Sequence, residues 1–298
     1  MIGVVEFEQQ RRRLFGIAYR MLGTRHEAEE IVQEAWLRWQ GTDRAAVREP
    51  AAFLATTTTR LAINEAQSAR ARRETYIGPW LPEPVDTGAD PLLGAVTGEA
   101  LELGVLMLLE KLTPTERATY VLREAFDYGF DEISDVVGKD PANCRQILSR
   151  ARRRVAEDRR RFDPDPEEGR ALALRFLDAA RKGDMDGLVA MLATDAVLVG
   201  DGGGKARSIG TPMVGALQVG RALATFYRMG EDWGVTLRPA VVNGGPGFRS
   251  FDAAGRLVNV VGLDVEDGVI TRVHSMLNPD KLGHLGPVSD LGLRPRQA

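Results

Sequence analysis

Residues 112–155 read LTPTERATYVLREAFDYGFDEISDVVGKDPANCRQILSRARRRV, and the helix signals in this stretch decide the fold of the middle of the chain. Thr113 is expected to cap a helix, with Glu116 completing a capping box. A second short helix is predicted to end at Gly138, and a third to begin after the cap Asp140. Two short helices joined by a glycine-containing turn, the second rich in arginine, predict a helix-turn-helix.

The third of these helices concentrates arginine in a way that suits a polyanion. A recognition helix needs its first turn free to meet base edges and needs cations along its length to hold phosphates. The side chains expected to contact DNA are Asn143, Arg145, Arg150, Arg152 and Arg153. The simpler alternative is the solvated basic face of an ordinary bundle helix.

The net charge of −3 conceals an uneven distribution of charge. Residues 1–73 and residues 111–162 each carry 12 basic and 9 acidic side chains, whereas residues 74–110 carry 7 acidic and no basic ones. Basic blocks in an acidic chain predict a local contact with a polyanion. The acidic segment is expected to fold onto the basic helices and to suppress DNA binding in the free protein.

The composition predicts a soluble, cytoplasmic protein of two or three domains with no membrane partner. Its 298 residues are 44% hydrophobic, yet no stretch is long and apolar enough to span a membrane. The charged start lacks the apolar core of a signal peptide. A single cysteine, Cys144, excludes an internal disulfide, and three scattered histidines do not form a typical zinc site, so no metal or cofactor is expected.

The segments on the two sides of the helix-turn-helix differ in composition and in predicted secondary structure. Residues 24–40 form a predicted helix with Thr24 as N-cap and an apolar stripe, and residues 50–74 form another that begins at Pro50. Glycine and proline dominate 74–98, which is therefore a linker. After residue 169 the pattern predicts an α+β domain of roughly 120 residues. Its expected helices cover 171–197 and 215–230, and its expected strands cover 196–200, 235–243, 247–252, 256–266 and 269–277, with hairpin turns at 252–255 and 266–268.

The order of these pieces resembles the extracytoplasmic-function sigma factors of the sigma-70 family. That family's region two has a hallmark close to Asp-Ala-Glu-Asp-x-x-Gln-Glu, and residues 27–34 of this chain follow it with Glu in both Asp positions. The resemblance implies that this helix docks on the clamp coiled coil of the largest subunit of core RNA polymerase. The residues that it assigns to this contact are Glu30, Gln33, Glu34 and Trp36.

The same resemblance assigns promoter contacts to two further segments. Residues 53–74 are similar to the helix that melts and reads the −10 element, and residues 112–155 resemble region four, which reads the −35 element. The family commonly has Asn, Asp and Arg where this chain has Arg60, Asn64 and Gln67, so the base preference at −10 stays open. The assigned −10 contacts are Arg60, Asn64, Arg70, Arg72 and Arg73.

The C-terminal part resembles the SnoaL-like extension of one group of these sigma factors. Three strings typical of that group are present: WLPEP at 80–84, DGGGK at 201–205 and NPDKL at 278–282. Trp80 and the Pro-Glu-Pro turn are expected to press against the C-terminal domain near the DGGGK loop and the NPDKL end, with the extension regulating activity in cis. The alternative is a mobile loop at 201–205. The assigned regulatory residues are Trp80, Leu81, Pro82, Glu83, Pro84, Asp201, Gly202, Gly203, Gly204, Lys205, Asn278, Pro279, Asp280, Lys281 and Leu282.

The expected architecture is therefore multidomain, with two all-α domains followed by an α+β SnoaL-like cone. The predicted segments are region two at 1–75, the acidic linker at 76–105, region four at 106–162 and the regulatory domain at 168–285. Core RNA polymerase and promoter DNA are the expected partners.

Two other functions remain as alternatives. Relatives of the cone use a carboxylate for proton transfer, and strand parity places Asp264, Arg272 and His274 on one face with Val258, Val260 and Met276. Such a group is more often an ion pair beside a half-buried histidine, so the chain is not expected to be an enzyme. The second alternative is a DNA-binding regulator that senses a small ligand in the cone.

Overall fold

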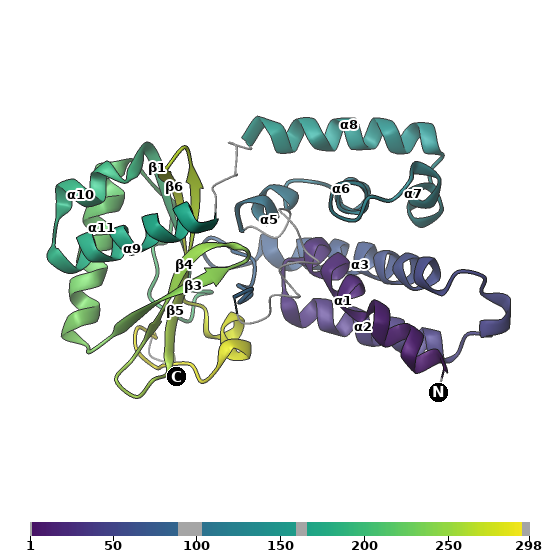
Figure 1. Ribbon diagram of the computed structural model, residues 1–298, viewed down its shortest axis with the longest axis horizontal. Coiled ribbons are helices and arrows are strands. Elements are labelled where there is room, and N and C mark those ends of the chain that lie inside the picture. The colour runs from purple at the N-terminus through teal and green to yellow at the C-terminus, as the bar shows by residue number, and fades with distance from the viewer. Residues whose placement is uncertain (1, 89–102, 159–165, 294–298) are drawn as a thin grey trace. The chain divides into compact units, whose positions relative to one another are not determined.

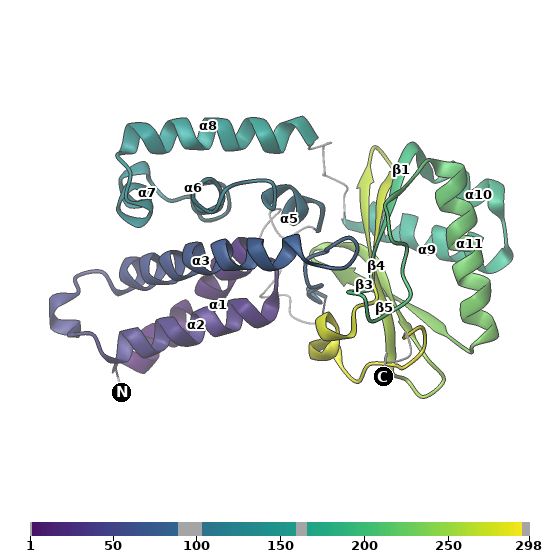
Figure 2. The ribbon, with the colours of Figure 1, turned by 180° about the vertical axis from the view of Figure 1, so that it is seen from behind.

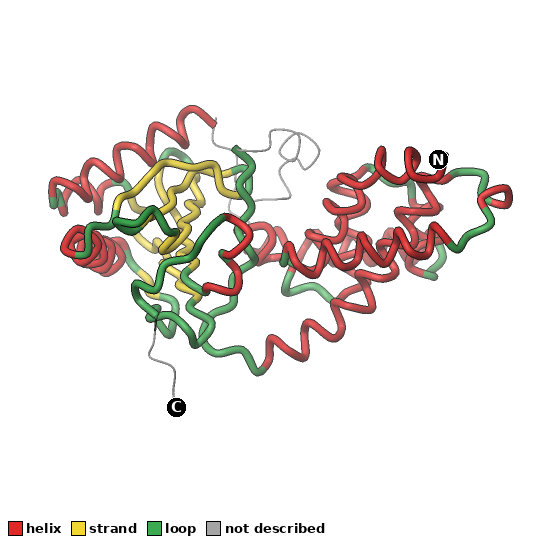
Figure 3. Tube along the Cα trace, turned by 90° about the horizontal axis from the view of Figure 1, so that it is seen from below, coloured by secondary structure: helices red, strands yellow, loops and turns green. Residues whose placement is uncertain are grey.

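A computed structural model describes residues 2–88, 103–158 and 166–293. Within these ranges the chain forms two compact units. The first contains residues 2–75 and 105–158, and the second contains residues 76–88, 103–104 and 166–293. Figure 3 shows that the strands lie in the second unit, whereas the first is built of helices joined by loops. The segment 76–88, the first part of the predicted acidic linker, packs as part of the second unit.

The first unit follows the capping signals of the sequence. Thr113 and Glu116 form the complete capping box, α7 ends at Gly138 in the left-handed conformation (φ 67°), and Asp140 Oδ1 accepts the Asn143 amide proton at 2.9 Å. The helices are α1 (Ile2–Leu22), α2 (Arg25–Gln40), α3 (Pro50–Glu74), α5 (Leu103–Leu109), α6 (Pro114–Phe126), α7 (Phe130–Val137) and α8 (Pro141–Asp158), with a 3₁₀ turn, η1 (Arg44–Ala46).

The core of α1, α2 and α3 is apolar with a few polar anchors. Leu14, Ile17 and Leu54 are fully buried, and the buried Trp39 indole donates to the Gly3 carbonyl at 2.8 Å. Four threonines are poor helix formers, but Thr58 and Thr59 are buried in α3. Packing therefore overrides the weak local helix propensity of this segment.

The second unit contains one mixed sheet in the order β2-β1-β6-β5-β4-β3. The β1–β6 pair is parallel and the other pairs are antiparallel. The helices are α9 (Pro166–Lys182), α10 (Met185–Ala190) and α11 (Ala216–Asp232), the strands are β1 (Leu192–Asp201), β2 (Met213–Val214), β3 (Thr236–Val242), β4 (Gly245–Phe251), β5 (Leu257–Glu266) and β6 (Val269–Met276), and two 3₁₀ turns, η3 (Pro279–Lys281) and η4 (Gly283–Leu285), follow.

The two faces of this sheet have different coverings. Figures 1 and 2 show α9, α10 and α11 gathered on one side of it, with the turns after β6 on the other. Val261, Leu263 and Val265 of β5 belong to the core that these helices close. The alternate residues of β5, including Asp264, face the opposite side. There Leu103 lies where a Cβ on Gly262 would be placed.

Two sequence expectations about this unit were wrong in detail. Residues 192–195 are strand rather than helix, because the chain leaves α10 at Ala190 and enters the sheet beside β6. The β5–β6 turn has two residues, Asp267 and Gly268, both with positive φ. A bulge between Asp264 and Val265 then shifts the pairing of the two strands, so that Val265 lies opposite Ile270 and Asp264 opposite Arg272. Among the described residues, no helix is long and apolar enough to cross a membrane.

Candidate nucleic-acid and polymerase interfaces

The exposed face of α8 is the candidate surface for double-stranded DNA. Cys144, Ile147 and Leu148 are buried against the unit, so the opposite side of the helix faces solvent. Arg145, Arg150 and Arg153 are exposed there. The Arg145 guanidinium lies over the Phe130 ring, 5.0 Å from its centroid. This stacking holds Arg145 close to the first turn of the helix, where base contacts are made in helix-turn-helix proteins.

Two arginines of α8 have intramolecular partners. Arg152 Nη2 lies 2.7 Å from the Glu124 carboxylate, and Arg154 Nη1 lies 2.7 Å from that of Glu116. Both acceptors belong to α6. Arg152, predicted as a DNA contact, therefore braces α8 against α6 in this structure, while Asn143 is half-buried beside its cap.

Sequence reasoning missed two uncharged polar side chains on this surface. Gln146 and Ser149 are exposed, and together with Ala142 and Arg153 they occupy positions i, i+4, i+7 and i+11 of one helical line. A glutamine that faces the major groove pairs with both edge groups of adenine. Counting the helical period from the predicted helix start would have placed both residues on the exposed line of this helix.

A second candidate surface lies on α2. Glu30 and Gln33 are exposed; Glu34 pairs with Arg38 at 3.0 Å and Glu30 lies 3.4 Å from His26. Trp36 is half-buried and its ring centroid lies 4.9 Å from that of Phe7, so much of its surface is already used inside the unit.

Leu37 is the apolar member of the α2 surface that the sequence reasoning overlooked. Its side chain is 53% exposed, although leucine is usually buried. Positions 30, 33, 34 and 37 follow the i, i+3, i+4, i+7 rule, so Leu37 shares one helix face with the predicted polymerase contacts. An acidic face with one exposed leucine suits docking on a partner helix.

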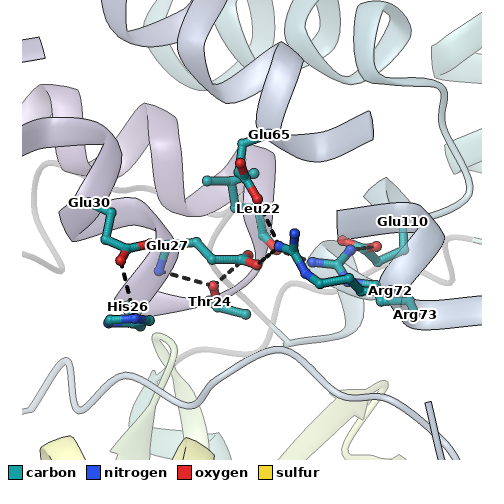
Figure 4. A network of polar contacts seen from close by, with 9 residues as sticks. All are labelled: Leu22, Thr24, His26, Glu27, Glu30, Glu65, Arg72, Arg73 and Glu110. Atoms are coloured by element: carbon teal, nitrogen blue, oxygen red, sulfur yellow. Dashed lines mark hydrogen bonds and ion pairs between the residues drawn. The ribbon is translucent and has the colours of Figure 1, made fainter. Parts of the chain in front are cut away.

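The five predicted −10 contacts of α3 fall into two groups. Asn64 and Arg70 are exposed and point away from the helix core. Arg72 is held inside region two, because its Nη2 lies 2.5 Å from Glu27 and 2.8 Å from Glu65 (Figure 4). These carboxylates raise the pKa of Arg72 and compete with phosphate for it.

Arg60 and Arg73 each make a polar contact with residues of region four. Arg60 donates to the carbonyls of Asp135 and Val136 at the end of α7. Arg73 pairs with Glu110, just after α5, and donates to the Leu22 carbonyl (Figure 4). Burial lowers the pKa of Arg73 to about 10.

The three sequence strings of the second unit come together around one buried ion pair. Lys281 Nζ lies 2.8 Å from Asp201 Oδ2, and both side chains are almost fully buried. The Asp201 carboxylate also accepts from the Tyr76 hydroxyl at 2.5 Å and from the Leu81 amide at 2.9 Å. Lys281 in turn donates to the Leu81 carbonyl at 2.6 Å. These contacts, termed the clasp below, fasten residues 76–81 to the end of β1 and to η3.

Trp80 contributes to the clasp at the NPDKL string. Its indole lies over Lys281, with Nζ 4.4 Å from the ring centroid. Ile77 lies beside Gly204, and the Asn278 side chain occupies the space where Gly203 would carry a Cβ. Gly203 and Gly204 have φ of 57° and 72°, so only glycine gives both the left-handed turn and this close approach.

Residues 82–88 continue from the clasp along the second unit. Pro82, Glu83 and Pro84 are buried, and the Pro84 carbonyl lies 2.9 Å from His284 Nε2. Beyond them the chain pairs with the edge strand β3, where the Asn243 amide donates to the Val85 carbonyl at 2.9 Å. Asp86 forms an ion pair with Arg249.

The remaining regulatory residues and the candidate catalytic group have structural partners as well. Lys205 lies 2.5 Å from Asp280 in an exposed pair. Asp264 Oδ2 lies 2.8 Å from His274 Nε2, and both side chains are buried. This pair lies on the sheet face turned away from α9, α10 and α11. The bulge leaves Asp264 opposite Arg272.

The geometry describes two helical regions with candidate binding surfaces and an α+β domain that holds the connecting segment. Comparisons with known proteins agree with this class. Residues 7–72 match the model of "Sigma-70 region 2", and residues 103–155 match that of "Sigma-70, region 4". The chain is 37% identical over 292 residues to the ECF RNA polymerase sigma factor SigJ of Mycobacterium tuberculosis (strain ATCC 25618 / H37Rv), covering 93% of this chain and 92% of that protein.

The similarity extends to a solved structure. The crystal structure of the Mycobacterium tuberculosis extracytoplasmic function sigma factor SigJ matches with a TM-score of 0.77 and 33% identity, over 96% of this chain and all of that one. The chain therefore belongs to the ECF RNA polymerase sigma factors, which direct promoter-specific initiation as subunits of the polymerase and are not enzymes. The predicted architecture of helical sigma-70 regions followed by an α+β domain is confirmed.

Proposed function

We propose that the C-terminal domain regulates this sigma factor in cis by holding the segment that leaves region two. The observation that carries the proposal is the buried Asp201–Lys281 pair, which fixes the linker backbone at Leu81 from both sides. Between the end of α3 and the start of α5, residues 76–88 are bound to the domain and only 89–102 have no described position. Holding half of this connection shortens the reach available between region two and region four.

The promoter and polymerase contacts of this chain are proposed at the residue level. The acidic face of α2, comprising Glu30, Gln33, Glu34 and the adjoining Leu37 and Trp36, docks on the clamp coiled coil of core polymerase. Arg60, Asn64, Arg70, Arg72 and Arg73 serve the −10 element. The exposed line of α8, with Asn143, Arg145, Arg150 and Arg153, enters the −35 major groove, and Arg152 joins it once released from Glu124. These contacts form in the cytoplasm, where core polymerase and promoter DNA are found.

The acidic segment acts in part through contacts that the structure describes. Glu83 and Asp86 lie in the second unit, and Glu110 pairs with arginines of the first. Asp90, Glu99 and Glu102 lie outside the described residues. A small ligand in the C-terminal cone stays a prediction.

The test is transcription in vitro with purified core polymerase on a library of promoter fragments. Full-length protein is compared with a form that ends at residue 165 and therefore lacks Asp201 and Lys281. We expect transcripts that depend on the protein from both forms, with a different promoter range or yield when the clasp is absent. Equal transcript profiles from the two forms would remove the regulatory role. No protein-dependent transcripts and no core binding would contradict the assigned contacts.

A further inference from the structure

A carboxylate between two buried arginines joins region two to region four in the first unit. Glu110 accepts from Arg73 of α3 and, at 2.6 Å, from Arg117 of α6. The side chains of Arg73 and Arg117 are only 17% and 5% exposed. Figure 4 shows Glu110 reaching Arg73 beside Leu22, at the end of α1. One negative charge therefore serves two cations that have little access to water.

The same arginines bind the free carbonyls at helix ends. Arg117 donates to the Met21 carbonyl at 2.8 Å, and Arg73 donates to that of Leu22. Arg60 does the same at the end of α7, with Nη2 2.5 Å from the Asp135 carbonyl and Nε 3.2 Å from that of Val136. The last carbonyls of a helix lack intrahelical donors and carry partial negative charge, so they attract cations. These carbonyl oxygens therefore occupy the guanidinium donors that phosphate oxygens would otherwise accept from.

Charge burial makes the junction sensitive to the loss of its acceptor. Desolvation lowers the pKa of Arg117 to about 9, and desolvation together with the nearby Arg117 lowers that of Arg73 to about 10. Arg20 is fully buried in the same interface over the Phe126 ring, and two of its guanidinium nitrogens have no hydrogen-bond partner. A junction with this much buried positive charge opens readily when a compensating carboxylate is removed.

We propose that Glu110 latches region two to region four in the free protein, and that the latch withholds Arg60 and Arg73 from −10 DNA. A guanidinium that donates to a helix end or to Glu110 cannot offer the same protons to phosphate. The proposal rests on the assignment of these arginines to the −10 element.

Promoter geometry requires the latch to open. Elements centred about 25 base pairs apart lie about 85 Å apart along B-DNA, at roughly 3.4 Å per pair. In the latched form, the −10 residue Arg60 is hydrogen-bonded to α7, which belongs to the same helix-turn-helix as the −35 reader. Both elements are therefore read only after this contact breaks, and polymerase binding is the step that separates the regions.

The experiment uses full-length protein with Glu110→Gln, which removes the charge and retains the size of the side chain. The matched control is Glu29→Gln, which removes the same charge from region two, because Glu29 pairs with Arg25 and Arg25 is not assigned to the −10 element. Binding to a fluorescent single-stranded −10 oligonucleotide is measured without polymerase. Dyes on Ala45→Cys and Asp131→Cys, both exposed positions, report the separation of the regions, since the native Cys144 is buried.

We expect Glu110→Gln to lower the energy transfer and to tighten −10 binding by about fivefold or more, with little change for Glu29→Gln. Equal tightening in both variants would mean a simple charge effect and would overturn the latch. Lower energy transfer with unchanged −10 affinity would also overturn it, as would no change in either signal. Failure of the wild-type holoenzyme to use the −10 element would instead refute the assignment of the arginines.

Discussion

Lys281 shows how a single side chain joins three distant parts of this chain. Its ammonium group binds Asp201 and the Leu81 carbonyl, and it lies under the rings of Tyr76 and Trp80. Burial, together with the hydrogen bond to Asp201, raises the pKa of the Tyr76 hydroxyl, so Tyr76 is a donor at neutral pH. The clasp is therefore a fully hydrogen-bonded polar cluster, in which each member depends on the others.

Replacing Lys281 with Met is expected to destabilise the second unit by about 3 kcal/mol or more. The change leaves Asp201 as a buried charge without its cation, and removing one partner of a buried pair is strongly destabilising. Urea unfolding and hydrogen exchange at residues 76–88 measure the effect. The control is Lys205→Met, which breaks the exposed pair with Asp280 and should cost about 0–1 kcal/mol. Equal effects of the two changes would contradict the clasp.

Gln146→Ala is expected to relax the base preference at one −35 position. Loss of a two-point contact with adenine reduces discrimination by about 1–3 kcal/mol at that position and leaves the others unchanged. Selection from a randomised −35 library by the holoenzyme measures this preference. Arg153→Ala serves as the control, since a lost phosphate contact weakens binding to all sequences alike. An unaltered selection profile in Gln146→Ala would argue against its base contact.

At the level of single helices, α2 and α8 expose their proposed binding faces by the same rule. Each helix buries one apolar stripe and leaves the opposite side chains to solvent, so the helical period sets which residues are available to a partner. The stripe of α2 contains Ala28, Ile31, Val32, Ala35 and Trp39. What differs is the partner: α2 offers carboxylates and a leucine, whereas α8 offers arginines and amides.

Leu37→Ala is expected to lower affinity for core polymerase about tenfold, with unchanged folding. The side chain is exposed in the free protein, so its truncation removes interface area without leaving a cavity in the unit. Titration with labelled core polymerase gives the affinity, and circular dichroism monitors the fold. Leu174→Ala, at an exposed position of α9, should bind core polymerase as the wild type does.

The turn after η4 should loosen in strong acid. Asp252 accepts from Ser289, from the Arg256 backbone and from the Arg256 guanidinium, and these bonds lower its pKa to about 2. A depressed pKa stabilises the folded form above about pH 4, and this contribution is lost as the pH falls towards 2. The Ser289 amide donates to the Leu257 carbonyl at 2.8 Å, and its protection against hydrogen exchange, relative to the intrinsic rate at each pH, should fall in that window. Asp252→Asn should abolish the pH dependence of this protection.

For the whole molecule, charge is segregated so that the basic blocks bind DNA while the acidic connection is used inside the protein. Arg70, Arg145, Arg150 and Arg153 remain exposed, whereas Glu83 is buried and Asp86 and Glu110 are paired. A protein of net charge −3 can therefore bind a polyanion through local surfaces.

Promoter binding by the holoenzyme should weaken steeply with salt. About four arginine–phosphate contacts predict a loss of about 10²-fold in affinity between 50 and 200 mM salt, because each contact releases condensed counterions. Filter binding or fluorescence anisotropy over this range gives the slope of log affinity against log salt. The double change Arg150→Ala and Arg153→Ala should reduce that slope by about two. A slope that does not respond to the double change would place the phosphates elsewhere.

Local sequence patterns were enough to predict the helix boundaries of the helix-turn-helix and the family of the chain. Capping boxes, glycine ends and helical periods act over a few residues, so they can be read from a short stretch. The long-range partners became known from the packed fold. Arg73 meets Glu110 37 residues away, Lys281 meets Leu81 200 residues away, and the β5 bulge sets which residue faces Arg272. Such pairings depend on how packed elements bring distant charges together, and no short stretch of sequence encodes that.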